Sequence, residues 1–449
     1  MNRLILIGNG FDLAHDLKTS YKDFINWYWD QRLKKIYIQE VGNLDRIKDE
    51  DKAEFEKLLD NGEDEFKDPL CKLKLDLKDL EYIQNNFDNN YEENKIRLFS
   101  DYKSFLKNLD PRIKGGATQF AALDFIAYTI SKKGKSPTDD IDLSENLYKC
   151  IIPPKEYPLM ASIIKSVKEK GWTDIEKDYY ELLKETLKDD CKFTAKQLNN
   201  QLHFLQEKLI EYLKTLHITT LSQNIEGYIK EEITPEDISE KDKKEVIASV
   251  ENIFEAFKKT QEYEKRKIYF RDDYIKWQPQ RTLLLNFNYT ETTSVYKQTI
   301  TYNENFLEEI HIHGSLKKPE NIIFGYGDEL DKDYNEIIDK NDNRLLDFFK
   351  SVKYLETMNY RRLQEFLESD YFQVYIMGHS CGNSDRTLLN TIFEHKNCVS
   401  IKPFYHEWEE NGEKKNNYLD IVQNIYRNFT NLNLYRDRVV PKEKCEPLK

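Results

Sequence analysis

Four short apolar runs of this chain each end in residues that can hold a ligand or move a proton. They lie at residues 4–12, 284–290, 310–315 and 375–385. Asn288 carries an amide that can fix a sugar hydroxyl or a water molecule without adding charge. His313 in its neutral form can accept a proton near pH 7. Because ligands of open α/β sheets bind at the carboxyl ends of the strands, we expect these four pieces to form one site.

The first run leads into a turn that can bring the backbone close to a phosphate. Gly8 and Gly10 allow a tight turn, and a helix from about Asp12 would offer free N–H groups to an anion. Leu13 occupies the third glycine position of the dinucleotide-binding fingerprint, so the pattern is incomplete. The alternative is an ordinary strand-to-helix turn with Asp12 as its N-cap. If the turn serves only a phosphate, Gly10→Val weakens binding and spares the fold.

The third run places two histidines at alternating positions. A strand over residues 310–313 would put His311 and His313 on one face. Hydrogen-bonded structure is the plainest interpretation of such a pair, and a metal site is another. A metal needs a third ligand, and Glu308 and Glu309 precede the strand in a charged loop without a compact ligand pattern. We therefore expect no metal.

The elements that position these residues belong to an α/β fold. Residues 282–286 and 373–377 read as buried strands, and apolar residues after position 385 repeat as in a helix. The region between the first run at residues 4–7 and about residue 282 is mostly helical in pattern, with amphipathic segments at 175–187 and 198–216. Thr173 or Asp174 is suited to cap the first of them. We predict a Rossmann-like parallel sheet core from residues 1–40 and 275–449, interrupted by a mainly helical insertion at 41–274.

Five sequence motifs are distinctive when taken together, namely residues 7–15 (IGNGFDLAH) with 17–21, residues 287–290 (FNYT), 311–315 (HIHGS), 322–328 (IIFGYGD) and 378–385 (GHSCGNSD). In this order they resemble the AbiH family of bacterial phage abortive-infection proteins. Their order is also similar to that of the sirtuin-like NAD-consuming superfamily. The resemblance implies antiviral defence, with NAD as a substrate whose nicotinamide–ribose bond is hydrolysed.

The resemblance also implies roles for individual residues. His313 matches the general base, and Asn288 matches the residue that positions the ribose or the attacking water. The residues expected to contact the nucleotide are Gly8, Asn9, Gly10, Phe11, Asp12, Tyr289, Gly325, Asp328, Gly378, Ser380 and Asp385. Two alternatives stay open, namely a non-catalytic nucleotide-binding sensor or partner subunit and a metal-dependent nuclease.

Composition limits the remaining function classes. The net charge of −13 argues against a general nucleic-acid surface. The six cysteines are widely separated, whereas protein deacetylases of the sirtuin type carry paired Cys-x-x-Cys zinc ligands. No apolar run is long enough to span a bilayer, and we expect a cytoplasmic protein. A phage-derived trigger or partner protein and a homo-oligomer are compatible with the sequence.

Overall fold

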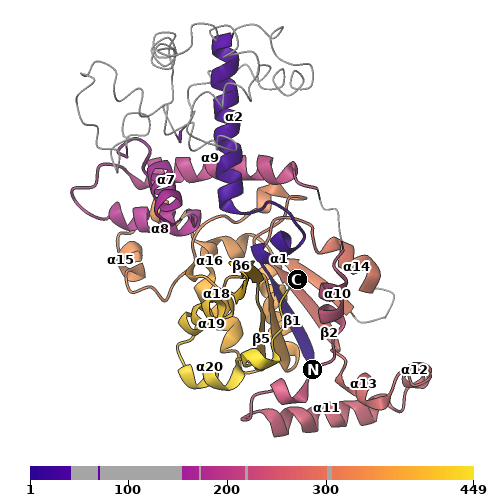
Figure 1. The fold of residues 1–449 in the computed structure, drawn as a ribbon. Helices are drawn as coiled ribbons and strands as arrows, with labels where there is room; N and C mark the ends of the chain where they lie inside the picture. Colours follow the sequence, from indigo (N-terminus) through magenta and orange to yellow (C-terminus); the bar gives the residue numbers. More distant parts are fainter. Residues whose placement is uncertain (42–68, 71–153, 171–172, 218–220, 301–305, 449) are drawn as a thin grey trace. The chain divides into compact units, whose positions relative to one another are not determined.

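The chain divides into two compact units, Met1–Thr19 with Leu213–Lys449 and Ser20–Tyr212. This computed structural model describes residues 1–41, 69–70, 154–170, 173–217, 221–300 and 306–448 (Figure 1). Within these ranges, no helix combines the length and the apolar character that crossing a membrane requires.

A five-stranded parallel sheet carries the core of the first unit (Figure 1). Its strands are β1 (Asn2–Ile7), β2 (Arg281–Asn286), β3 (Phe306–His311), β4 (Phe372–Met377) and β5 (Cys398–Phe404). They lie side by side in the order β3-β2-β1-β4-β5, and each neighbouring pair is parallel. The chain runs outward from β1 to β3 and returns on the other side of β1, so the topological switch lies between β1 and β4. The predicted Rossmann-like α/β core is confirmed.

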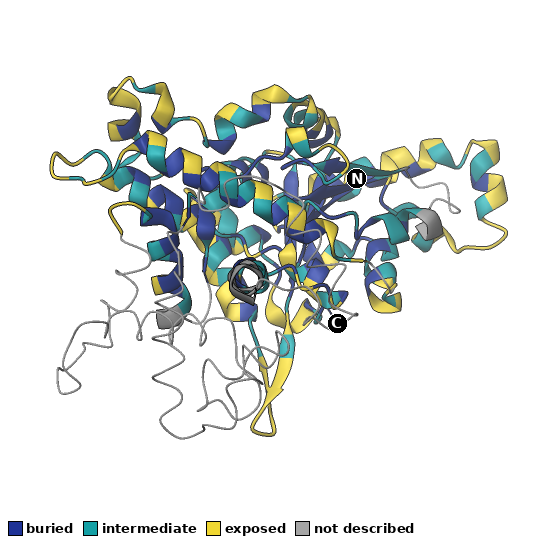
Figure 2. Ribbon diagram, turned by 90° about the horizontal axis from the view of Figure 1, so that it is seen from above, coloured by how far each residue is buried: buried dark blue, intermediate teal, exposed yellow. Residues whose placement is uncertain are grey.

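Helices cover both faces of this sheet, because successive residues of each strand point in opposite directions. Leu4 and Leu6 of β1 pack on the face covered by α17 (Asn359–Ser369), α18 (Arg386–Phe393) and α19 (Tyr418–Arg427). Ile5 and Ile7 pack on the other face. That face is covered by α1 (Asn9–Ala14), α10 (Gln223–Lys230) and α14 (Ser294–Ile300). Burial of each such side chain stabilises the fold by about 1.5–3 kcal/mol. β1 and β4 are buried along their whole length, in keeping with the dark blue interior in Figure 2.

Further short elements surround the sheet. They are α11 (Lys243–Phe257), α12 (Gln261–Arg266), α13 (Asp272–Trp277), α15 (Tyr334–Asp339), α16 (Lys350–Lys353) and α20 (Leu432–Arg438). An antiparallel hairpin of β6 (Glu407–Glu410) and β7 (Glu413–Asn416) follows β5. Its residues are mostly exposed, as the yellow hairpin in Figure 2 shows.

The helices after residue 213 belong to the unit that contains the sheet. Ile225 and Ile229 of α10 share a core cluster with β1, and Val246 of α11 packs with Met1 and Val399. The unit boundaries therefore lie at residues 19/20 and 212/213, whereas the sequence suggests an insertion from 41 to 274. Helical periodicity shows that a helix has an apolar face, but not which surface that face covers.

The second unit is helical in its described part. It contains α2 (Tyr21–Val41), α7 (Pro158–Lys170), α8 (Ile175–Glu185) and most of α9 (Ala195–Lys214). Asp174 caps α8 by accepting a hydrogen bond from the backbone N–H of Lys177 at 3.1 Å. The phenol of Tyr179 in α8 donates to Asn199 of α9 at 2.8 Å, which joins these two helices.

Three local predictions at the strand ends are wrong. The first helix begins at Asn9 with Gly8 as its N-cap residue, so Asp12 lies inside α1 and not at its start. The third strand ends at His311, so Ile312 and His313 lie beyond it. Glu309, which the sequence places in a loop, lies within β3. An error of a few residues in the position of a strand end places a side chain in a different environment.

Candidate functional site

The turns after β1 and β4 pack directly against each other at the topological switch. The N–H of Gly10 donates to the carbonyl of Gly378 at 2.8 Å. A Cβ atom on Gly10 would lie 2.9 Å from the Cα of Gly378, and one on Gly8 would lie 2.5 Å from the Cα of His379. Gly378 also has a positive φ of 75°. These glycines are therefore required by the packing of one turn on the other.

Asp385 lies at the centre of a buried polar cluster at the same edge of the sheet. Its carboxylate lies 2.8 Å from the ammonium of Lys350 and 3.2 Å from Nε2 of His313. Nε2 of His379 lies 3.5 Å from the second carboxylate oxygen. Asp385 is the N-cap residue of α18 but makes no capping hydrogen bond with its side chain. Its carboxylate is committed to Lys350 and the two histidines.

The charges of this cluster are set by burial and by Lys350. Burial alone would raise the pKa of Asp385, but the charge of Lys350 and the contact with His313 hold it well below its ordinary value. Burial and the nearby Lys350 charge lower the pKa of His313 to about 4. Asp385 is therefore a carboxylate and His313 a neutral imidazole at pH 7. The pair is a hydrogen bond between a neutral donor and a charged acceptor.

The tautomers of both histidines follow from their partners. An ionised carboxylate only accepts hydrogen bonds, so Nε2 of His313 must carry the proton that faces Asp385. Tyr354 places its hydroxyl 3.1 Å from the same nitrogen. Among the described residues, Nδ1 of His313 makes no hydrogen bond and keeps its lone pair. In His379, Nδ1 accepts from the N–H of Cys381 at 3.0 Å, so its proton also lies on Nε2.

The loop after β2 contacts the first turn. The amide of Asn288 donates to the carbonyl of Gly8 at 3.0 Å, and the hydroxyl of Thr290 donates to Asp12 at 2.5 Å. Burial raises the pKa of Asp12, although the hydrogen bond from Thr290 opposes this shift. The structure thus brings Asn288, Gly8 and Asp12 together. The Asp12 side chain is a hydrogen-bond acceptor in this contact, and the predicted N-cap role is wrong.

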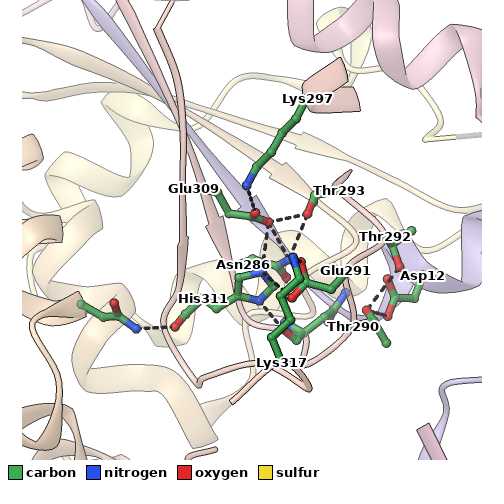
Figure 3. A network of polar contacts seen from close by, with 12 residues as sticks. Asp12, Asn286, Thr290, Glu291, Thr292, Thr293, Lys297, Glu309, His311 and Lys317 are labelled. Carbon is green, nitrogen blue, oxygen red and sulfur yellow. Dashed lines mark hydrogen bonds and ion pairs between the residues drawn. The ribbon is translucent and has the colours of Figure 1, made fainter. Parts of the chain in front are cut away.

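A second polar network lies at the end of β3 (Figure 3). Glu309 is its centre, with a side chain that is only 3% exposed and that contacts Lys297 and Thr293. Nε2 of His311 lies 3.3 Å from Glu309 and 3.8 Å from Glu291. Burial opposes ionisation of Glu309, yet its contacts with His311 and Lys297 hold its pKa below the ordinary value. His311 and His313 therefore belong to different networks, and their predicted common face is wrong.

The remaining predicted contact residues are spread over the same edge of the sheet. Asn9 and Ser380 are exposed, whereas Phe11 packs into the core against Tyr296. Tyr289 donates its hydroxyl to the carbonyl of Ile323 at 3.0 Å. These side chains do not converge on a single point.

Two more predicted residues lie in the loop that precedes α15. Asp328 accepts a long hydrogen bond of 3.4 Å from Arg386. Gly325 has no room for a side chain, since a Cβ atom there would lie 2.0 Å from the carbonyl oxygen of Phe348. In the described part of the chain, no hydrogen bond joins the side chains of Asn288 and His313.

Sequence reasoning missed two members of the Asp385 cluster. Lys350 enters from the start of α16, where no local pattern distinguishes it from the many other lysines of the chain. His379 stands within the motif at residues 378–385, and its place directly after a buried strand was the available signal. Tyr354 is a third addition, through its contact with His313.

Comparison with known families gives this geometry a biological context. The family model for bacteriophage abortive infection AbiH matches residues 4–406. The chain belongs to the AbiH family of bacteriophage abortive infection proteins. The match begins in β1 and ends two residues after β5, so it includes all the site residues of this AbiH chain. No curated protein and no solved structure matches it. Family membership indicates a role in defence against bacteriophage.

Proposed function

We propose that the chain acts in phage defence by hydrolysing the nicotinamide–ribose bond of NAD, with His313 as general base. One observation carries this proposal. His313 is neutral, its Nε2–H faces Asp385, and the lone pair on its Nδ1 makes no hydrogen bond within the described residues. This is how a carboxylate orients an imidazole that accepts a proton in other hydrolases. The turns at the β1–β4 switch add support, because this is where doubly wound sheets bind dinucleotides.

The reaction needs a base that accepts the proton of the attacking water. The electrons of the bond between C1′ and the nicotinamide nitrogen leave with the nicotinamide, whose ring becomes neutral. The ribose becomes an oxocarbenium-like cation that water attacks at C1′, and the water proton passes to Nδ1 of His313 and then to solvent. Burial and the Lys350 charge keep the pKa of His313 below neutrality, so its imidazole is unprotonated at pH 7 and Nδ1 can accept this proton. Asn288 would hold the ribose hydroxyls or the water.

Burial of the site supports an activity that is held off until infection. His313 is only 4% exposed, so little of its imidazole is accessible to a substrate in this conformation, and we propose that the surrounding loops move on activation. An enzyme that drained NAD without control would harm its own host. We therefore expect expression in the absence of phage to be tolerated, with NAD consumed only after infection.

Cellular NAD measurements test the proposal. Cells expressing the wild-type chain should keep normal NAD before infection and lose it afterwards. Cells expressing His313→Ala should keep their NAD after infection. His395→Ala is the matched control, because His395 pairs with Glu368 at the opposite edge of the sheet. Constant NAD in infected wild-type cells, together with intact NAD bound to the purified chain, would favour the non-catalytic sensor.

A further inference from the structure

We propose that Glu291, Glu309 and His311 form a site for one Zn²⁺ or Mn²⁺ ion at the end of β3. One imidazole nitrogen and two carboxylate oxygens lie within 4.8 Å of one another here. The three residues come from the loop after β2 and from β3, so the fold assembles them from separate segments (Figure 3). This inference is independent of NAD hydrolysis, because it rests on ligand geometry alone.

The orientation of His311 matches that of a metal ligand. Its Nδ1 lies 3.1 Å from the backbone carbonyl of Asn288, which can only accept a hydrogen bond. The Nδ1 proton therefore faces this carbonyl, and Nε2 faces the two carboxylates. Histidines that bind metals commonly donate their other N–H to a carbonyl or carboxylate, which fixes the ring and its tautomer.

In both glutamates, Oε2 contacts a lysine and Oε1 faces the imidazole of His311, where a cation could bind. Lys297 contacts Oε2 of Glu309, and Lys317 lies 2.7 Å from Oε2 of Glu291. The Oε1 atoms of both glutamates face Nε2 of His311, at 3.3 Å for Glu309 and 3.8 Å for Glu291. Each carboxylate thus has one oxygen on a lysine and one oxygen directed at the imidazole.

Two buried atoms at the centre of this cluster, Nε2 of His311 and Oε1 of Glu291, make no well-formed hydrogen bond among the described residues. The contact of Nε2 with Oε1 of Glu309 is an ion-pair contact of 3.3 Å, and its contact with Oε1 of Glu291 is longer, at 3.8 Å. A buried polar atom without a partner costs about 1–3 kcal/mol, so such atoms point to a missing ligand. A single cation between the three side chains satisfies both atoms and also coordinates Oε1 of Glu309, which Thr293 and Asn286 hold in place.

The donor set selects the class of metal. Imidazole nitrogen combined with carboxylate oxygens suits Zn²⁺ and Mn²⁺, whereas Mg²⁺ and Ca²⁺ take oxygen ligands almost exclusively. Three protein ligands leave at least one position for water, as in catalytic zinc sites. The sequence alone did not indicate this site, because it placed Glu309 in a loop and gave no reason to bring Glu291 near it.

Metal titration of the full-length chain tests the site. The protein is stripped with a chelator, dialysed, and titrated with ZnCl₂, MnCl₂ and MgCl₂ in separate calorimetric experiments. We expect one Zn²⁺ or Mn²⁺ per chain and much weaker binding of Mg²⁺. Glu291→Gln should weaken binding by more than the about 10–100-fold that outer-shell changes cost. Glu308→Gln is the matched control, because it makes the same Glu-to-Gln change at a residue of β3 that is bound to Arg281 and lies outside the proposed ligand set.

Thermal melting of the same proteins separates a lost ligand from a damaged fold. Zn²⁺ should raise the Tm of the wild-type chain and of Glu308→Gln, and should leave the Tm of Glu291→Gln unchanged. Zn²⁺ should likewise leave the Tm of His311→Ala unchanged. The proposal is overturned if the stripped wild-type chain binds no ion at millimolar metal, if Glu291→Gln binds as tightly as wild type, or if Mg²⁺ binds as tightly as Zn²⁺.

Discussion

Lys350 and Asp385 form an ion pair of 2.8 Å in which the two side chains are 1% and 9% exposed. Water cannot screen charges at this depth, so each ion depends on the other for its stability. The same pair controls His313, because the ammonium helps to keep the imidazole neutral while the carboxylate orients its Nε2–H. The protonation state of His313, which follows β3, therefore depends on Lys350, which lies at the start of α16.

Removing the ammonium alone should destabilise the first unit strongly. Lys350→Met leaves the Asp385 charge buried without its cation, which typically costs about 3–5 kcal/mol. Asp385→Asn in the same chain removes the stranded charge, so the double variant should recover much of that loss. Urea unfolding of the two variants and wild type measures both effects. If Lys350→Met were as stable as wild type, the ion pair with Asp385 would not contribute to the free energy of unfolding.

Gly10→Ala should destabilise the fold and not only weaken a ligand. The new Cβ would lie 2.9 Å from backbone atoms of Gly378, which cannot move aside as a flexible side chain can. Overpacking of this kind costs about 1–3 kcal/mol. This corrects the expectation that a larger residue at position 10 spares the fold, since the space beside Gly10 is filled by another turn of the protein.

Gly227→Ala provides the control for that substitution. Gly227 lies within α10, and a Cβ atom there would meet nothing within 4 Å. Alanine in a helix is favoured over glycine by about 0.5–1 kcal/mol, so this variant should melt at or above the wild-type temperature. Equal melting temperatures for the two alanine variants would contradict the packing of the first turn on Gly378.

Asp12→Asn should stabilise the chain at neutral pH. The folded state raises the pKa of Asp12 above its ordinary 3.8, so folding favours the protonated form. The stability that this group contributes is complete below pH 3.8 and is lost as the pH rises through the folded pKa. The amide of asparagine stays neutral at every pH. Its advantage in Tm over wild type should thus be present at pH 7 and should shrink on acidification, and a wild-type chain that melts higher at pH 7 would contradict this.

Continuous apolar runs made three of the strands predictable. β1, β2 and β4 are buried along most or all of their length, and such strands leave a clear signal. β5 was not anticipated, although it is buried throughout, because Ser400, Lys402 and Pro403 interrupt its apolar pattern. Lys402 is accommodated there by Glu446, which lies 3.0 Å away and 44 positions later in the sequence.

The location of the candidate site was predictable from the sequence, but which side chains contact one another there was not. Polar residues after parallel strands had to meet at one edge, and Asp385 and His313 do contact each other. Lys350, the partner of Asp385, was not predictable because it reaches the site from outside the strands. The same holds for Glu291 in the separate network around His311. The two histidines separate because β3 ends at His311, and strand ends are the least certain part of a sequence-based prediction.

Nicotinamide release by the purified chain tests the central claim most directly. The wild-type chain, His313→Ala and His395→Ala are isolated from cells harvested after phage infection and incubated with NAD, and the products are separated by chromatography. We predict that wild type and His395→Ala release nicotinamide and ADP-ribose at the same rate as each other. The rate of nicotinamide release by His313→Ala should be lower by about 10²–10⁴-fold. Equal rates for wild type and His313→Ala, or intact NAD with all three proteins, would contradict the account.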